Sequence, residues 1–442
     1  MIKAFFISIL TILLSTTLAL AEVDGTTSIK ESVAGAVRQH PQIKSLLYNR
    51  DAMARNLSAA LGRFFPSLDL TSNYGFQEYS SSTTRGEGTD DRTRTASDTT
   101  LKVTQNVFDG MSRYNTYEGS KARLSSAEYR LFNNVETIGL DAIRAHIDVV
   151  RQRRLVNLAE ENIVAHQEVL ESIAERVAGG AGSKADEMQA RGRVARAETT
   201  LVTYTGGLHT AEASYIRLVG KMPGALSDPF FHTEYIPADM NQIMETSLKE
   251  NPRIKVYQAE VLSAEKNKNV TNAAMFPTVD LEVSSRHTDN LDGAKTYLRD
   301  DRAMLAMSWN LFSGGSDYSS LQASDSRVRE AESNLQDATD ELSREVAVAW
   351  TEYQTAVGQI EKHQEALQYS MESRDMYLMQ FNVGQRSLLD VLDSINEVFS
   401  NSVLLETAQS NLYFTQYKFL ALNGELIKTL EIESKTYDSK MK

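Results

Sequence analysis

Residues 381–393 read Phe-Asn-Val-Gly-Gln-Arg-Ser-Leu-Leu-Asp-Val-Leu-Asp and give the clearest local indication of the fold. Gly384 is the residue type that most often closes a helix in the left-handed conformation. Ser387 and Asp390 have the Ser-x-x-Asp spacing of a capping box, which starts a new helix. The stretch therefore predicts a tight helical hairpin with its tip at Gly384.

The same pattern occurs 204 positions earlier, as Gly180, Ser183 and Asp186. The correspondence needs no gap over residues 106–220, and it continues at a shift of 211 on the N-terminal side of a loop that is shorter in the second copy. Such self-similarity predicts two copies of one large structural unit. The expected organisation is a signal peptide (1–21), a first repeat (22–220), a linker (221–240), a second repeat (241–424) and a polar C-terminal tail (425–442).

Long helices are predicted on the N-terminal side of both tips, because apolar residues recur there at every seventh position. A strict seven-residue repeat keeps one seam facing a partner helix and favours a left-handed coiled coil. A continuous helix over 111–177 would be about 100 Å long, at about 1.5 Å per residue. The repeating positions are Tyr117, Leu124, Leu131, Ile138 and Ala145 in the first copy and Leu321, Val328, Leu335, Leu342, Ala349 and Ala356 in the second.

Each repeat is expected to open with a helix, over 27–62 and 241–274, that ends at a Phe-Pro pair, since proline disfavours helical backbone in the residue before it. Two strands should follow, because apolar and polar residues then alternate with period two. The strands are about 10 residues or longer, which is enough to cross a bilayer when tilted. The alternation includes Leu68, Leu70, Tyr74 and Phe76 in the first strand and Leu305, Met307, Trp309 and Leu311 in the last, with polar loops at 80–95 and 287–300.

The N-terminal segment and the amino-acid composition limit the classes of protein to which this chain can belong. Lys3, the apolar run 4–18 and Ala19-Leu20-Ala21 have the pattern of a cleaved secretory signal. A net charge of −13 argues against nucleic acid as a partner, because binding phosphate requires clustered lysine and arginine. The chain has no cysteine, and its seven histidines show no metal-ligand spacing. We therefore expect no disulfide, no cysteine-linked lipid, no metal site, no cofactor and no enzymatic activity.

Together these features resemble the TolC family of outer-membrane channel proteins, over essentially the whole mature chain. Residues 381–393 follow the family's second hairpin tip, 107–110 and 311–315 match its strand-to-helix junctions, and 40–41 and 251–252 match its repeat-opening dipeptide. The resemblance implies a mixed α and β membrane protein that is a homotrimer. Four strands per chain would close a shared twelve-stranded β-barrel in outer-membrane lipid, and the long helices would form an α-helical coiled-coil barrel in the periplasm. The strand count by itself requires oligomerisation, because an open sheet edge in lipid leaves backbone groups unsatisfied.

The resemblance also implies a gate at the periplasmic end. Asp390 and Asp393 match acidic constriction rings, and Arg386 matches a basic residue that latches the closed state. Asp186 matches the latch partner in the first hairpin, and Phe381 stands where many relatives have a latching tyrosine. Phe381 has no hydroxyl, so that bond cannot form here. The hairpin tips at Gly180, Ser183, Gly384 and Ser387 would dock a periplasmic adaptor protein.

A plainer interpretation of these residues stays open at this point. Asp390 and Asp186 have the spacing to complete capping boxes with the serines before them, and Arg386 would then be a solvated arginine in a loop. Asp393 has no such capping role.

The expected function is a passive outer-membrane exit duct that receives substrate from an inner-membrane transporter through the adaptor. Type I protein secretion is favoured, because the missing cysteine disfavours the lipidated drug-efflux branch of the family. Small-molecule or multidrug efflux is the alternative. A periplasmic coiled-coil structural protein without a pore is a further alternative, which the period-two strands oppose.

Overall fold

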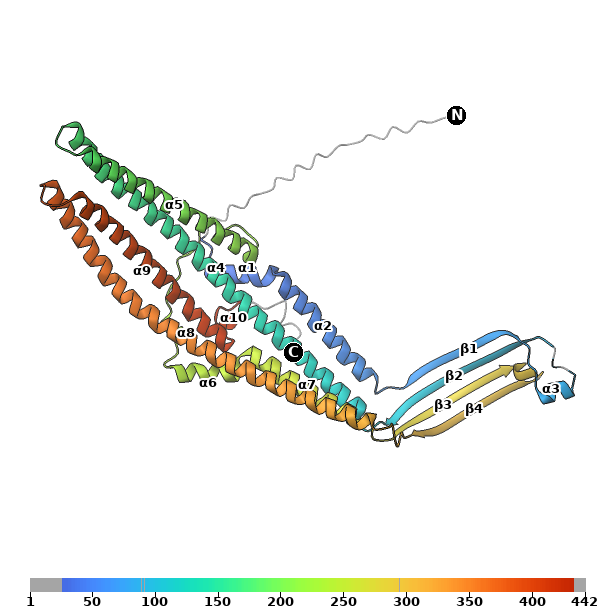
Figure 1. Ribbon diagram of the computed structural model, residues 1–442. Helices are drawn as coiled ribbons and strands as arrows, with labels where there is room; N and C mark the ends of the chain where they lie inside the picture. Colours follow the sequence, from blue (N-terminus) through green and yellow to red (C-terminus); the bar gives the residue numbers. More distant parts are fainter. Residues whose placement is uncertain (1–25, 89, 91, 294, 433–442) are drawn as a thin grey trace, which may run out of the picture.

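The computed structural model describes residues 26–88, 90, 92–293 and 295–432. The predicted signal peptide, 1–21, and residues 433–442 of the predicted tail lie outside the described residues. Figure 1 shows an elongated molecule with a four-stranded sheet at one end and two helical hairpin tips at the other. Within the described residues, no helix combines the length and the apolar character needed to span a membrane.

Apart from short helices, the two halves have the same order of helices and strands, and corresponding helices have equal lengths of 11, 22, 67 and 36 residues. This confirms the internal duplication and both long helices. The first half contains α1 (Ile29–Gln39), α2 (Pro41–Gly62), β1 (Ser67–Gln77), α3 (Ser82–Gly86), β2 (Arg94–Phe108), α4 (Ser112–Ala178) and α5 (Lys184–Val219). The second half contains η1 (Thr233–Tyr235), α6 (Met240–Glu250), α7 (Pro252–Ala273), β3 (Thr278–Asp289), η2 (Leu291–Gly293), β4 (Tyr297–Ser308), α8 (Ser316–Asn382), α9 (Leu388–Asn423) and α10 (Leu426–Thr429).

The prediction of one opening helix per repeat was wrong, because each is broken into two. The breaks lie at His40 and Asn251, whose extended backbone has ψ of 125° and 126°. The following proline has no N–H to donate and pushes the preceding residue out of helical conformation, but it fits well in the first turn of a new helix. α2 and α7 therefore start afresh at Pro41 and Pro252.

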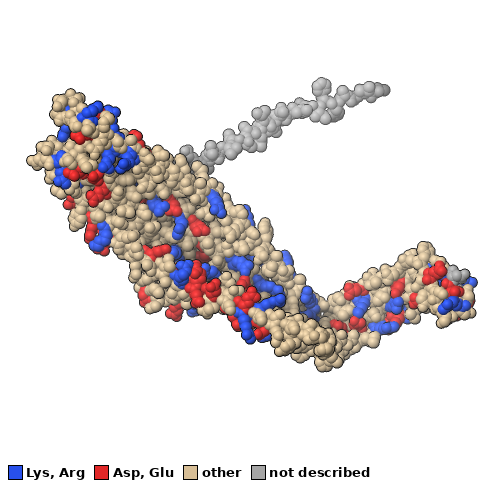
Figure 2. All heavy atoms as spheres, in the orientation of Figure 1, with Lys and Arg blue, Asp and Glu red and all other residues tan. Residues whose placement is uncertain are grey.

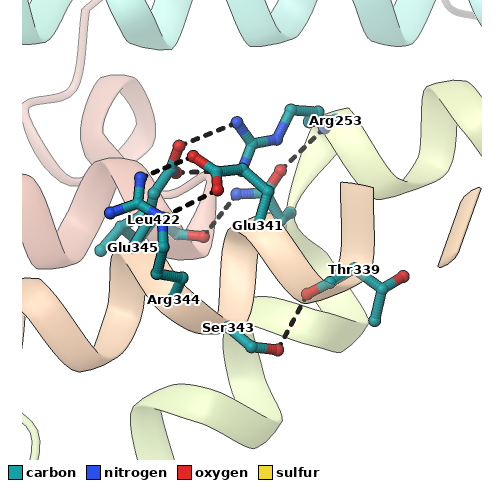
Figure 3. Close-up of polar contacts among 8 residues, drawn as sticks. Arg253, Thr339, Glu341, Ser343, Arg344, Glu345 and Leu422 are labelled. Atoms are coloured by element: carbon teal, nitrogen blue, oxygen red, sulfur yellow. Dashed lines mark hydrogen bonds and ion pairs between the residues drawn. The ribbon is translucent and has the colours of Figure 1, made fainter. Parts of the chain in front are cut away.

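Polar contacts hold the second break against the middle of α8 and the C-terminal end of α9 (Figure 3). The side chain of Asn251 accepts a hydrogen bond from the Arg253 N–H at 2.8 Å and donates one to the Leu422 carbonyl at 2.8 Å. The Arg253 guanidinium donates to both carboxylate oxygens of Glu345 at 3.1 and 2.9 Å. This bidentate ion pair fixes the first turn of α7 on α8.

The four strands form one antiparallel sheet in the order β1-β2-β3-β4. One row of the register joins Leu68, Val103, Val283 and Ala303, so the predicted apolar positions share one face. The opposite face is polar and carries cross-strand pairs such as Lys102 with Glu282 at 2.7 Å. Among the described residues, no strand pairs with the outer edge of β1 or of β4.

The predicted strands and loops need three corrections. β4 ends at Ser308, so Trp309 and Leu311 lie beyond it, where the chain turns toward α8. The loop predicted over 80–95 contains the short helix α3, which Ser81 caps through a reciprocal pair of hydrogen bonds with Thr84. The loop predicted over 287–300 is shorter, because β3 continues to Asp289 and β4 starts at Tyr297.

The core lies along the seams of the long helices, and Leu131, Ile138, Leu342 and Ala349 of the heptad positions are buried there. The prediction of a polar tail from residue 425 was wrong for its first part. Leu426, Ile427 and Ile432 join the apolar cluster formed by α1, α4 and the end of α9. An apolar run this short shows no periodicity in the sequence, and only the packing surface supplied by α4 buries it.

Glu136 of α4 is buried beside this C-terminal segment and accepts hydrogen bonds from the N–H groups of Leu426 at 3.0 Å and Ile427 at 3.3 Å. Burial raises the pKa of its carboxyl to about 8 from the ordinary value of 4.5, although the two hydrogen bonds oppose this shift. Between pH 4.5 and about 8, the folded state therefore binds one more proton than the unfolded state does. The stability that the protonated group contributes is complete below pH 4.5 and is lost as the pH rises toward 8.

We therefore expect Glu136→Gln, which cannot ionise but keeps only one of the two acceptor oxygens, to gain on the order of 3 kcal/mol in free energy of unfolding relative to the wild type between pH 4.5 and pH 8. Unfolding of both proteins, followed by circular dichroism from pH 4.5 to 8.5, measures the difference. Glu160→Gln, at an exposed position of the same helix, is the control. A stability difference that does not grow with pH would contradict the prediction.

Candidate functional site

The two hairpin tips, between α4 and α5 and between α8 and α9, lie at the end of the molecule away from the sheet (Figure 1). Gly180 and Gly384 have φ of 76° and 78°, the left-handed conformation that glycine adopts without strain. The N–H of Ala181 donates to the Arg176 carbonyl, and the N–H of Gln385 donates to the Gln380 carbonyl, each at 2.9 Å. Both turns are thus the predicted helix-ending motif, and both hairpins are confirmed.

The two serines cap the returning helices, but the predicted capping boxes are not formed. Ser183 accepts from the Ala185 N–H and Ser387 from the Asp390 N–H, both at 3.2 Å. In the described structure neither aspartate returns a bond to its serine. The Asp390 carboxylate lies 3.0 Å from Arg386 Nε instead, because a charged partner attracts it more strongly than a neutral N–H.

Arg386 is held within its own hairpin. Besides its ion pair with Asp390, its guanidinium lies over the Tyr377 ring, 3.8 Å from the centroid. Within one chain, Arg386 contacts Asp390 and not Asp186, which belongs to the other hairpin. The predicted latch between Arg386 and Asp186 is therefore absent among the described contacts of the protomer.

Phe381 has a packing role in place of a hydroxyl contact. Its side chain is buried in an apolar cluster between the hairpins near their tips, which we call the tip cluster. The tip cluster consists of Val169, Ile173, Phe381, Leu388, Val391, Leu392 and Ile395. Beside it lies a groove of 460 Å³, lined on one wall by Glu168 and Ser172 and on the other by Arg374 and Asp375.

Two arginines that the sequence analysis missed join the hairpins. The Arg176 guanidinium lies 4.5 Å from the centroid of the Phe381 ring and donates to the Phe381 carbonyl at 3.4 Å and to Asn382 Oδ1 at 3.3 Å. Arg193 of α5 donates to Asp393 Oδ1 of α9 at 2.6 Å. These partners are about 200 residues apart in sequence, so their only sequence signal is that each arginine lies within a few turns of Gly180.

Charged side chains of both signs gather around the tips (Figure 2). The described residues contain no group of three histidine, aspartate or glutamate side chains that could hold a metal ion. The arrangement offers ion pairs and an apolar seam between the two hairpins.

Comparisons with known proteins agree with this architecture. Residues 34–221 and 243–424 each match the family model described as outer membrane efflux protein, so one match falls in each half of the duplication. The outer membrane efflux protein BepC of Brucella suis biovar 1 (strain 1330) is 23% identical over 409 residues, which cover 91% of this chain and 87% of BepC. The outer membrane protein TolC of Escherichia coli (strain K12) is 21% identical over 406 residues, which cover 88% and 80%.

A third relative is the alkaline protease secretion protein AprF of Pseudomonas aeruginosa (strain PAO1), 19% identical over 412 residues, which cover 90% of this chain and 84% of AprF. The crystal structure of the outer membrane protein VceC from Vibrio cholerae has the same fold. It superposes with a TM-score of 0.78 at 16% identity and covers 92% of this chain and 97% of VceC.

These matches span both halves of the chain, which a periplasmic coiled-coil protein without a channel would not be expected to show. They confirm the family, the fold and the outer-membrane location that the sequence predicted. The chain belongs to the outer membrane efflux protein family, the TolC family of non-enzymatic channels of the bacterial outer membrane.

Proposed function

We propose that three copies of this chain form the exit duct of a type I protein secretion system. Channels of the TolC family form trimers within tripartite pumps. The observation that supports a trimer of this chain is the open sheet. β1 and β4 each present an edge that a neighbouring copy can pair, and the apolar face of the sheet exposes Leu68, Leu70 and Phe76. Three such sheets give a twelve-stranded barrel in lipid with no free edge.

The gate of this duct lies at the hairpin tips. Three copies place six carboxylates, from Asp390 and Asp393, around one axis, and Arg386 and Phe381 hold the hairpin that carries them. The tip residues Gly180, Ser183, Gly384 and Ser387 and the nearby Asp186 are exposed or half-buried in the protomer, as a docking site for a periplasmic adaptor requires. An inner-membrane transporter supplies the energy, since the duct itself is passive.

The cargo proposal rests on AprF, whose name assigns it to the secretion of a protease. The second candidate is efflux of small molecules, which is favoured by the greater identity to BepC, an efflux protein by name. A clean deletion of the gene in its source bacterium, with complementation, separates the two. We expect specific proteins to disappear from the culture medium while the minimal inhibitory concentrations of dyes, detergents and antibiotics stay unchanged. Lower inhibitory concentrations with an intact set of secreted proteins would assign the duct to small-molecule efflux.

A further inference from the structure

A hollow of 540 Å³ lies beside the middle of α8, and it shares no residue with the tip cluster. α8 supplies most of its wall, and α4 and α9 supply the rest. The lining combines apolar side chains with hydroxyl and amide groups, and the volume is in the range of sites for small molecules. The lining side chains that matter here are Arg144, Arg344, Val348, Thr351, Glu352 and Phe414.

The hollow opens on the side of the long helices opposite to α1 and α6. Ala142 of α4 is buried in the apolar cluster that includes α1, and Ala349 of α8 is buried in the cluster that includes α6. Arg144 and Thr351 each follow one of these alanines by two positions, which is about 200° around a helix axis. Because an additional layer of helices fits on the convex outer side of a closed wall, the hollow faces the lumen of the proposed duct.

Arg144 gives the hollow a free positive charge. Its side chain is exposed, and its guanidinium lies 4.2 Å from the centroid of the Phe414 ring. Among the described residues it forms no ion pair, and Asp141, one turn before it, acts on it only at longer range. A guanidinium that rests on an aromatic ring keeps the N–H groups at its edge available to an anion. The stacked arginine is therefore positioned to receive a negatively charged group.

The other charged side chains of the lining already have partners. Arg344 pairs with Glu341 at 2.6 Å, and Glu352 pairs with Lys418 at 2.6 Å. The opposite charges of each pair largely cancel at the distance of a ligand. The net charge that a ligand meets in the hollow is therefore that of Arg144.

We propose that this hollow binds small anionic amphiphiles, which are molecules with a flat apolar body and one carboxylate or sulfonate group. The apolar body lies against Val348 and Phe414, and the acidic group accepts hydrogen bonds from the Arg144 guanidinium. The proposal goes beyond the proposed function, and only the placement of the hollow in the lumen depends on that function.

The test measures binding of naphthalene-1-sulfonate to the full-length trimer in lipid nanodiscs by isothermal titration calorimetry, with empty nanodiscs as the blank. Arg144→Gln is expected to weaken binding on the order of tenfold, because a charge-assisted contact is lost. Arg144→Glu should reverse the charge preference, so that 1-naphthylmethylammonium binds more tightly than the sulfonate. Arg151→Gln is the matched control and should bind as the wild type does. Arg151 lies two turns further along α4, pairs with Asp148 at 3.0 Å and is not part of the lining.

A variant that fills the hollow shows whether the probe binds there. Thr351→Trp should abolish binding of naphthalene-1-sulfonate, and the circular dichroism of the variant checks that it is folded. Wild-type affinity in either Thr351→Trp or Arg144→Gln would overturn the proposal. A wild-type trimer that does not bind the sulfonate, combined with a Thr351→Trp trimer that dissociates in native mass spectrometry, would also overturn it and would assign the hollow to contact between copies of the chain.

Planar-bilayer recordings test the placement in the lumen. Naphthalene-1-sulfonate is expected to lower the conductance of the wild-type trimer and to leave that of Thr351→Trp unchanged. Binding in calorimetry without any change of wild-type conductance would overturn the placement in the lumen. Calorimetry detects the ligand without any cargo. A gene deletion that alters neither secretion nor drug resistance would therefore count against the proposed function and not against the binding site.

Discussion

Gly110→Ala is expected to destabilise the protein by about 2–5 kcal/mol, whereas Gly314→Ala should cost only about 1–2 kcal/mol. The two glycines occupy equivalent positions of the two repeats, at the junction between a strand and a long helix, and have nearly the same φ, 63° and 66°. Any side chain at either position therefore meets the same backbone strain.

The expected difference in stability comes from the surroundings of the two glycines. A Cβ at Gly110 would lie 2.8 Å from the Ala273 carbonyl oxygen and 2.9 Å from Phe276 Cβ, so the end of α7 would have to move. In the described part of the chain, a Cβ at Gly314 would have no atom within 4 Å apart from those of its chain neighbours. Gly314→Ala thus reports the strain alone, and the excess cost at Gly110 reports the close approach of α7.

Denaturant unfolding of the purified protein in detergent, followed by circular dichroism, measures both substitutions. The helical signal of the folded variants is the check that each reaches the native state. Equal losses of unfolding free energy for the two substitutions would show that the junctions are packed alike and would contradict the prediction.

Phe381→Ala is the second large expected effect, with a loss of about 3–5 kcal/mol in the stability of the hairpin tips. The substitution empties the centre of the tip cluster and removes the ring beneath the Arg176 guanidinium. Because the tip cluster is separate from the clusters in the body of the molecule, we expect this loss to appear as local opening before global unfolding.

Limited proteolysis and amide hydrogen exchange at the tips measure this opening, and a higher resting conductance should accompany it. Phe381→Leu is the control, since it keeps most of the apolar volume and loses only the contact of the ring with Arg176. Tips that exchange as slowly in Phe381→Ala as in the wild type would show that the tip cluster does not hold the hairpins together.

Much of the fold could be predicted because its signals are local. The heptads of α4 and α8 reflect a helix that must keep one seam buried, and the period-two runs reflect strands with two different faces. The turns at Gly180 and Gly384 follow from the conformational freedom of glycine. The broken opening helices show the limit of such reasoning. The prolines could be identified in the sequence. Whether a helix ends or only kinks at a proline depends on contacts that stabilise the start of the next helix, such as the hydrogen bond from the Asn251 side chain to the Leu422 carbonyl.

The candidate site was predicted less completely. Asp390, Asp393, Arg386 and Phe381 could be proposed as site residues because they stand in one recognisable stretch of sequence. Arg176 and Arg193 carry no such pattern, and the reciprocal caps expected at the two serines are replaced by other contacts.

For this protein the sequence alone determined the duplicated order of helices and strands, because periodicity, glycine turns and caps act between residues a few positions apart. Only the tertiary structure decided which charges meet. Arg193 reaches Asp393, and Glu136 reaches the buried Leu426, across distances in sequence that no local pattern records. An ion pair or a buried carboxyl depends on where two separate helices come together, and that position is set by the packing of the whole chain.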